Sequence, residues 1–65
     1  MMYTAKQKAD EARREVAYRQ YVYPKRIAEG KMKKADAERR IAIMQEIFDD
    51  YAVQAEAEEA AGRLL

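Results

Sequence analysis

The chain has no cysteine and no histidine, and it also lacks serine, asparagine and tryptophan. Without cysteine it cannot form a disulfide, and without histidine it lacks the commonest side-chain ligand of transition metals. With no serine, cysteine or histidine there is also no usual pair of nucleophile and base, and Thr4 is expected to cap a helix. We therefore predict that the protein is not an enzyme and that it has no metal site and no cofactor.

Glycines and long hydrophobic runs are also scarce. The only glycines are Gly30 and Gly62, so the chain has no glycine-rich loop that could bind phosphate. The most hydrophobic run, residues 41–44, is far too short to cross a bilayer, and the N-terminal residues lack the apolar stretch of a signal peptide. From these absences we expect a soluble, cytoplasmic protein with no membrane partner and no small-molecule substrate.

The second half of the chain does contain a heptad pattern. Apolar residues recur there at alternating steps of four and three, the spacing of a helix seam: Ala37, Ile41, Met44, Phe48, Tyr51 and Ala55. Ile43 and Ile47 lie to one side of this seam, so the apolar arc spans roughly 160–180°, against the ~100° stripe of an ordinary surface helix. Because one partner helix covers only part of such an arc, we expect this helix to have at least two neighbours.

The first half predicts a helix with a narrower stripe of small residues. Thr4 and Gln7 have the spacing of a capping box at its start. The stripe follows at helical spacing: Ala5, Ala9, Ala12, Val16, Arg19 and Tyr23. Tyr18, Tyr21 and Val22 lie off this stripe and form a second apolar patch near the end of the helix. Exposed aromatic patches of this kind are typical of partner surfaces.

Pro24 and Gly30 divide the chain. Pro24 lacks the N–H that would bond to the carbonyl of Gln20, so we expect the first helix to kink or break near it. Gly30 suits the left-handed residue that closes a helix. The predicted fold is all-α, a single-domain antiparallel helical hairpin: helix 5–29 with a kink at 20–24, turn 30–32, helix 33–61 stopped by Gly62, and a frayed tail at 62–65.

Charge is unevenly distributed, because residues 1–34 carry ten Lys/Arg against four Asp/Glu and residues 35–65 carry three against eight. An antiparallel hairpin explains most of this asymmetry if residues whose numbers sum to roughly 62–64 face each other, which places Arg13 and Arg14 opposite Asp49 and Asp50. A basic tip remains around the turn, with these candidate nucleic-acid contacts: Arg19, Lys25, Arg26, Lys31, Lys33 and Lys34. Tyrosines 18, 21 and 23 are interleaved with them, and such rings can stack on unpaired bases.

The region from about residue 13 to residue 51 combines a basic run, the Val22-Tyr23-Pro24 tripeptide, Gly30 and the segment Ile41-Ala42-Ile43-Met44. In this combination it resembles a group of very short proteins encoded by phages and prophages of bacteria. Lys33 departs from the Ser or Thr expected at the start of the second helix. The group has no assigned activity, so the resemblance implies a genetic setting and a bacterial host cytoplasm, and it implies no site residues.

Two functions are alternatives at this point. The first is a protein-interaction module that self-associates and acts by binding a phage or host protein. Its candidate partner or dimer surface has five residues: Tyr18, Tyr21, Val22, Ile43 and Ile47. The second is a nucleic-acid-binding protein without sequence specificity that uses the basic tip.

Self-association is expected because Ile43 and Ile47 would otherwise leave an apolar patch on a small monomer. Two hairpins paired through this patch would form a homodimeric four-helix bundle. The alternative is a monomer in which the kinked first helix folds over the isoleucines, with Tyr23 and Ile27 as the lid.

Overall fold

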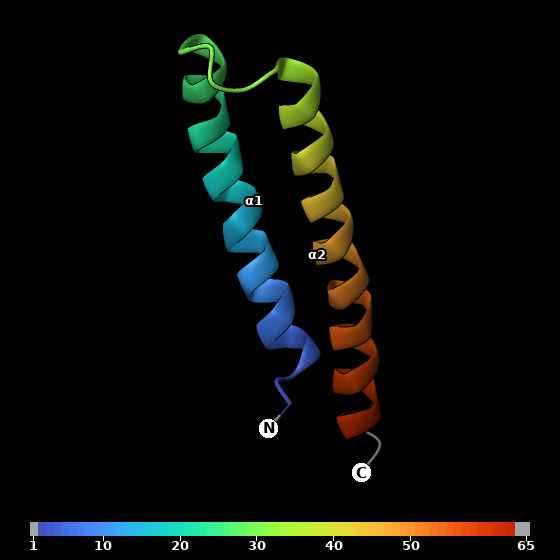
Figure 1. Cartoon of the computed structure of the whole chain (residues 1–65). Helices are drawn as coiled ribbons and strands as arrows, with labels where there is room; N and C mark the ends of the chain where they lie inside the picture. The colour runs from blue at the N-terminus through green and yellow to red at the C-terminus, as the bar shows by residue number, and fades with distance from the viewer. Residues whose placement is uncertain (1, 64–65) are drawn as a thin grey trace.

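The computed structural model describes residues 2–63 and contains two helices, α1 (Ala5–Ala28) and α2 (Lys34–Arg63). The helices lie side by side in opposite directions, so the two ends of the chain are at one end of the molecule and the turn is at the other (Figure 1). Residues 2–63 include no strand, and the predicted all-α helical hairpin is confirmed. The molecule is a rod with extents of 53 × 19 × 18 Å.

Local hydrogen bonds begin α1 where the sequence predicts. The Gln7 N–H donates to Thr4 Oγ1 at 3.1 Å, and the Thr4 N–H donates to Gln7 Oε1 at 2.9 Å. These reciprocal bonds are the predicted capping box, and they satisfy backbone groups that have no partner inside the helix. The Ala5 N–H donates to Glu58 Oε2 of α2 at 3.3 Å, so the far end of α2 also supports the start of α1.

Pro24 does not interrupt α1. The helix continues through Pro24 to Ala28, so the alternative of a break near Val22 is not observed. The missing N–H of a proline in a helix interior costs about 3 kcal/mol. Tyr23, the residue before it, is only 4% exposed, and its burial contributes a stabilisation of similar size, about 1.5–3 kcal/mol. Packing of the neighbouring residue therefore holds the helix together at Pro24.

Gly30 closes α1, as predicted. Its φ of 74° is in the left-handed region, where a residue without a Cβ is favoured. The Gly30 N–H donates to the carbonyl of Ile27 at 3.0 Å, and the Lys31 N–H donates to the carbonyl of Arg26 at 2.8 Å. These two bonds form a Schellman motif, with Glu29 as the C-cap. The helix therefore ends at Ala28, one residue before the expected end.

α2 is longer than the sequence predicts. It begins at Lys34, one residue later than expected, and its first backbone bond runs from the Ala37 N–H to the carbonyl of Lys33 at 3.0 Å. It continues through Gly62 to Arg63, so the predicted stop at Gly62 is wrong. A glycine without a left-handed φ is only a weak helix former, and it does not end a helix by itself. The expected tail beyond Arg63 lies outside the described residues.

The core of the hairpin is thin. Among residues 2–62, six apolar residues are buried, and five of them come from α1: Ala5, Ala9, Ala12, Val16, Tyr23 and Ala37. The seam residues Ile41, Met44, Phe48, Tyr51 and Ala55 of α2 are only half-buried. The radius of gyration is 15.3 Å, whereas a compact chain of this length has about 11 Å. Each helix thus has one neighbour and a large remaining surface.

Candidate functional site

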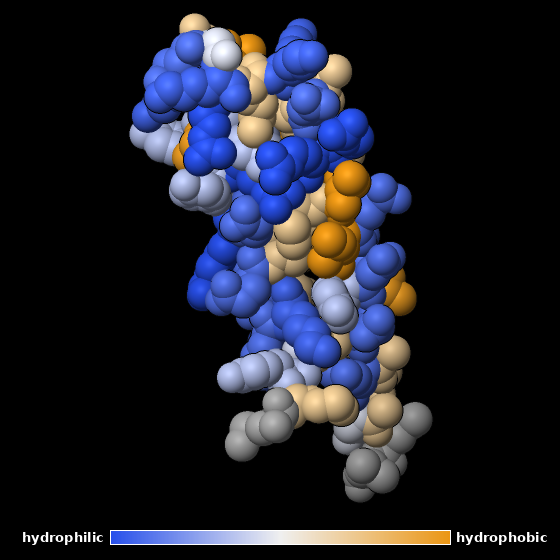
Figure 2. All heavy atoms as spheres, in the orientation of Figure 1, coloured by the Kyte–Doolittle hydropathy of each residue, from blue (hydrophilic) through white to orange (hydrophobic). Residues whose placement is uncertain are grey.

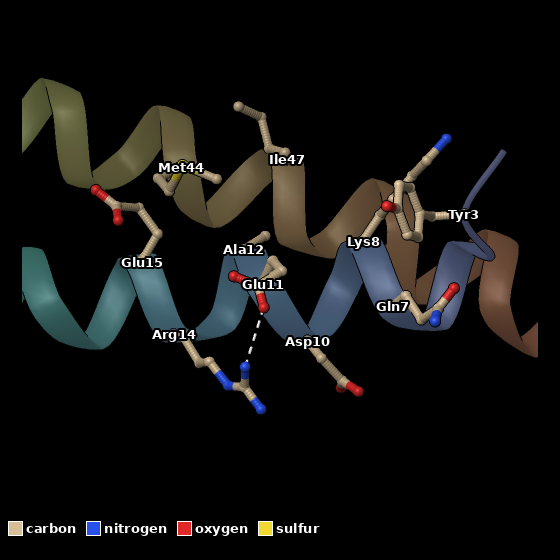
Figure 3. Close-up of a pocket in the computed structure, with 10 residues that line it drawn as sticks. All are labelled: Tyr3, Gln7, Lys8, Asp10, Glu11, Ala12, Arg14, Glu15, Met44 and Ile47. Atoms are coloured by element: carbon tan, nitrogen blue, oxygen red, sulfur yellow. Dashed lines mark hydrogen bonds and ion pairs between the residues drawn. The ribbon is translucent and has the colours of Figure 1, made fainter. Parts of the chain in front are cut away.

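An open groove of about 790 Å³ runs between the two helices on one face of the rod (Figure 3). Six residues of the helices form most of its lining: Lys8, Glu11, Ala12 and Glu15 from α1, and Met44 and Ile47 from α2. Tyr3 extends the groove from the segment before α1. The α1 residues recur at helical spacing, so they share one flank of the buried stripe.

The floor of the groove is apolar, with a small residue on α1 and larger residues on α2. Ala12 is buried and has only a methyl group, which lets α2 approach α1 closely. Met44 is half-buried against this position, and Ile47 projects away from α1 (Figure 3). Ile47 is 37% exposed and Ile43 is 49% exposed. α2 therefore presents branched apolar side chains that the hairpin itself does not cover.

The space-filling view shows exposed apolar side chains about midway along the rod, in a surface that is otherwise mainly hydrophilic (Figure 2). Ile43 and Ile47 are the exposed isoleucines of this stretch. The alternative in which α1 folds over them is not observed, because Tyr23 is buried in the seam and Ile43 and Ile47 stay open. The expected second neighbour of α2 is therefore absent from the single chain.

Charged side chains border the groove and tie its walls together. The Nζ of Lys8 lies 5.4 Å from the centre of the Tyr51 ring. The Nε of Arg19 bonds to Glu15 Oε1 at 2.9 Å, and its Nη1 donates to the carbonyl of Arg40 at 2.8 Å. Arg19 thus joins α1 to α2. It is one of the residues predicted to contact nucleic acid.

Of the five predicted partner residues, only Ile47 lines the groove. Ile47 lines the groove and Ile43 is exposed on the same helix, whereas Val22 is half-buried. Tyr18 and Tyr21 are exposed but do not line the groove. The Nζ of Lys25 lies 4.3 Å from the centre of the Tyr21 ring and donates to its hydroxyl at 3.2 Å. Tyr21 is therefore occupied by a cation of its own helix.

The groove residues of α1 were not among the predicted site residues. Lys8, Glu11 and Glu15 are charged, so a search for apolar arcs passes over them. Their spacing around Ala12 would have identified them, because positions three and four apart share a helix face.

In the basic tip, two of the predicted lysines lie near acidic side chains, and one of the predicted aromatic rings is buried. Lys31 pairs with Glu29 at 3.0 Å, and Lys34 lies 3.9 Å from Glu38. Tyr23 is buried, and the guanidinium of Arg26 lies 5.7 Å from the centre of its ring. The prediction that Tyr23 offers a ring for stacking on bases is therefore wrong.

A hollow of about 410 Å³ at the turn is lined in part by Lys31, Lys33 and Arg40. The hollow is also lined by Asp36, which bonds to Arg39 at 3.3 Å. Three cationic side chains and one carboxylate thus line this hollow.

The predicted pairing of charges across the helices is not observed. Arg14 pairs with Glu11 of its own helix at 3.0 Å, and between residues 2 and 63 no ion pair joins Arg13 or Arg14 to Asp49 or Asp50. Lys8 instead lies over the Tyr51 ring of α2, with its Nζ 5.4 Å from the ring centre.

The described residues include no group of three or more side chains that could hold a metal ion. Neither helix in this part of the chain has a stretch apolar enough and long enough to cross a membrane. Comparison of the chain with known protein families, curated proteins and solved structures found no match.

Proposed function

We propose that the protein is a protein-interaction module that self-associates through the groove between α1 and α2. The observation that carries the proposal is the apolar groove floor, where Ile47 is open to solvent beside Met44 and the buried Ala12. Charged residues surround this floor, as in protein interfaces with an apolar centre and a polar rim. A groove between two helices fits the ridge of another helix.

The exposed area of the chain supports the same proposal. The accessible surface is 5422 Å², whereas a compact monomer of 7.6 kDa exposes about 4,300 Å². The excess of about 1,100 Å² is comparable with the roughly 800 Å² that each partner buries in a standard protein interface. A second hairpin on the groove would therefore bring the exposed area per chain to the value of a compact protein. Two hairpins packed in this way form a four-helix bundle.

The oligomeric mass tests this proposal. Light scattering coupled to size exclusion should give a dimer at tens of micromolar, and Ile47→Glu should give a monomer, because it places a charge on the apolar floor. Val53→Glu is the matched control, since Val53 is also an exposed apolar residue of α2 but does not line the groove. Val53→Glu should remain a dimer, and both variants should keep the helical circular dichroism of the parent.

A monomeric parent protein would contradict the proposal. Equal loss of the dimer in the Ile47→Glu and Val53→Glu variants would place the interface elsewhere on α2. The resemblance to short phage and prophage proteins leads us to propose a phage or host protein as a further partner, acting in the cytoplasm of a bacterial host.

The basic tip supports a second candidate function, the binding of nucleic acid through phosphate contacts. Residues 19–40 carry eight cationic side chains against three acidic ones, a net charge of +5. Lys33 and Arg40 lie beside the hollow at the turn and make no ion pair among the described residues. A net positive surface of this kind attracts a phosphate backbone without reading its sequence.

Binding measured across a series of salt concentrations tests this candidate function. Binding to plain DNA or RNA should weaken steeply between about 50 and 200 mM salt, because each neutralised phosphate releases counterions. Replacing Lys31, Lys33 and Lys34 together by Gln should reduce the salt slope by up to about three units and leave the helical content unchanged. If the parent shows no binding at low salt, the tip has no role in nucleic-acid contact.

A further inference from the structure

We infer that the occupant of the groove is a second copy of this chain in head-to-tail orientation, with the turn of each hairpin beside the chain ends of the other. This inference rests on the proposed self-association and adds the orientation of the two copies. Two hairpins can pack face to face by a two-fold axis in two ways. Either the axis runs along the rods and both turns lie at one end, or it runs across them and the turns lie at opposite ends.

The burial of apolar surface does not favour either orientation over the other. The groove lies near the middle of the rod: Ile47 is 13 residues after Lys34 and 16 residues before Arg63, roughly 20 and 24 Å along α2. A two-fold axis beside Ile47 therefore gives almost complete overlap of the two rods in either orientation. Both arrangements would cover Ile47 and Met44 to a similar extent.

Electrostatic interactions between the two copies favour one orientation, because the rod has opposite net charges at its two ends. The turn end, residues 19–40, has a net charge of +5. The remaining described residues, 2–18 and 41–63, carry five cationic side chains against nine acidic ones, a net charge of −4. With the turns together, like charges would lie side by side at both ends of the dimer. With the turns apart, each basic tip lies beside the acidic part of the other copy.

The rim of the groove agrees with the head-to-tail arrangement. Lys8 and Glu15 lie on either side of Ala12, four and three residues away, and all three line the groove. A two-fold axis across the rods beside Ala12 pairs α1 with α1 of the other copy in opposite directions. Lys8 of each copy then comes level with Glu15 of the other, so the rim supplies two opposite-charge contacts.

The distance between the turns of the two copies tests the orientation. Ala35 and Ala57 are exposed residues near opposite ends of α2, and a cysteine at either would be the only one in the chain, so each can carry a single spin label. In Ala35→Cys the labels should lie about 36 Å apart in the head-to-tail dimer, twice the distance from the axis along α2. A separation near the 18–19 Å width of one rod would mean that the turns lie together and would overturn the inference.

Ala57→Cys is the matched control for the other end of the rod. Its labels should lie about 30 Å apart in the head-to-tail dimer, since Ala57 is ten residues from Ile47 along α2. Both variants keep every charged side chain, so they leave the attraction between the ends unchanged. A short distance in both would identify the arrangement with the turns together.

Salt provides an independent readout with opposite signs for the two orientations. Raising sodium chloride from 0.1 to 1 M shortens the Debye length from about 10 to about 3 Å. The dissociation constant of the head-to-tail dimer should rise with salt, whereas it should fall if the turns lie together. A dimer with a short Ala35 distance overturns the orientation alone. A monomeric parent overturns both the orientation and the proposed self-association, and it leaves the groove to a different partner.

Discussion

Replacing Gly30 by alanine tests the turn that joins the two helices. Gly30 has a φ of 74°, and a Cβ built on it would meet no atom within 4 Å. Alanine therefore has space at this position, and the whole cost of the change comes from the backbone conformation. Holding an L-residue in the left-handed region costs about 1–2 kcal/mol. We expect Gly30→Ala to lower the free energy of unfolding by this amount.

Thermal unfolding followed by circular dichroism measures this effect. A change of 1 kcal/mol moves the Tm of a domain of this size by about 4–8 °C, so the expected loss is about 5–15 °C. All variants need the same protein concentration, because the Tm of a self-associating protein depends on it. Gly30→Asn should lose less than Gly30→Ala, since asparagine tolerates the left-handed region better than other residues.

Gly62→Ala is the matched control. A Cβ on Gly62 also meets nothing within 4 Å, but Gly62 lies inside α2 and has no left-handed φ. Alanine is the better helix former by about 1 kcal/mol in a helix interior, so the Tm should rise, by less than that amount near the helix end. A Gly30→Ala protein that melts at or above the parent temperature would refute the left-handed turn. Equal losses in both variants would show that the effect is not specific to Gly30.

Three further changes test the ends and the packing of the helices by urea unfolding. Thr4→Ala removes the capping oxygen and should cost about 1 kcal/mol, whereas Thr4→Ser should keep most of the stability. Pro24→Ala restores a helical N–H and should add up to about 3 kcal/mol; a loss instead would show that the proline ring is needed to pack Tyr23. Ala12→Leu should cost about 1–3 kcal/mol, because Ala12 is buried between the helices. The same change at the exposed Ala42 should stay within about 0.5 kcal/mol, and equal effects at the two positions would contradict the observed packing.

The ends of α1 could be predicted from the sequence because the interactions that form them are local. Thr4 and Gln7 are three residues apart, and their reciprocal bonds need nothing from the rest of the chain. The helix closes through bonds from the Gly30 N–H to the carbonyl of Ile27 and from the Lys31 N–H to the carbonyl of Arg26, which span at most five residues. The seam of α2 follows from spacing alone, since a helix places residues three and four apart on one face.

Similar local signals at Pro24 and Gly62 do not end the helices: α1 continues through Pro24, so a break near Val22 is not observed, and α2 continues through Gly62. Each signal changes the free energy of the helix by only about 1–3 kcal/mol, and favourable contacts of the neighbouring residues can exceed this. At Pro24 the burial of Tyr23 is such a contribution. A sequence pattern indicates the free-energy cost of such a residue within its own helix, but it does not indicate the stabilisation that tertiary contacts supply.

The composition, the two helices and the wide apolar arc of α2 were thus determined by the sequence itself, through local geometry and spacing. Only the tertiary structure decided how that arc is used. The small side chains of Ala9 and Ala12 set how closely α2 approaches and how it is rotated about its axis, because both must be buried for the helices to meet. That rotation buries Tyr23 and leaves Ile43 and Ile47 open.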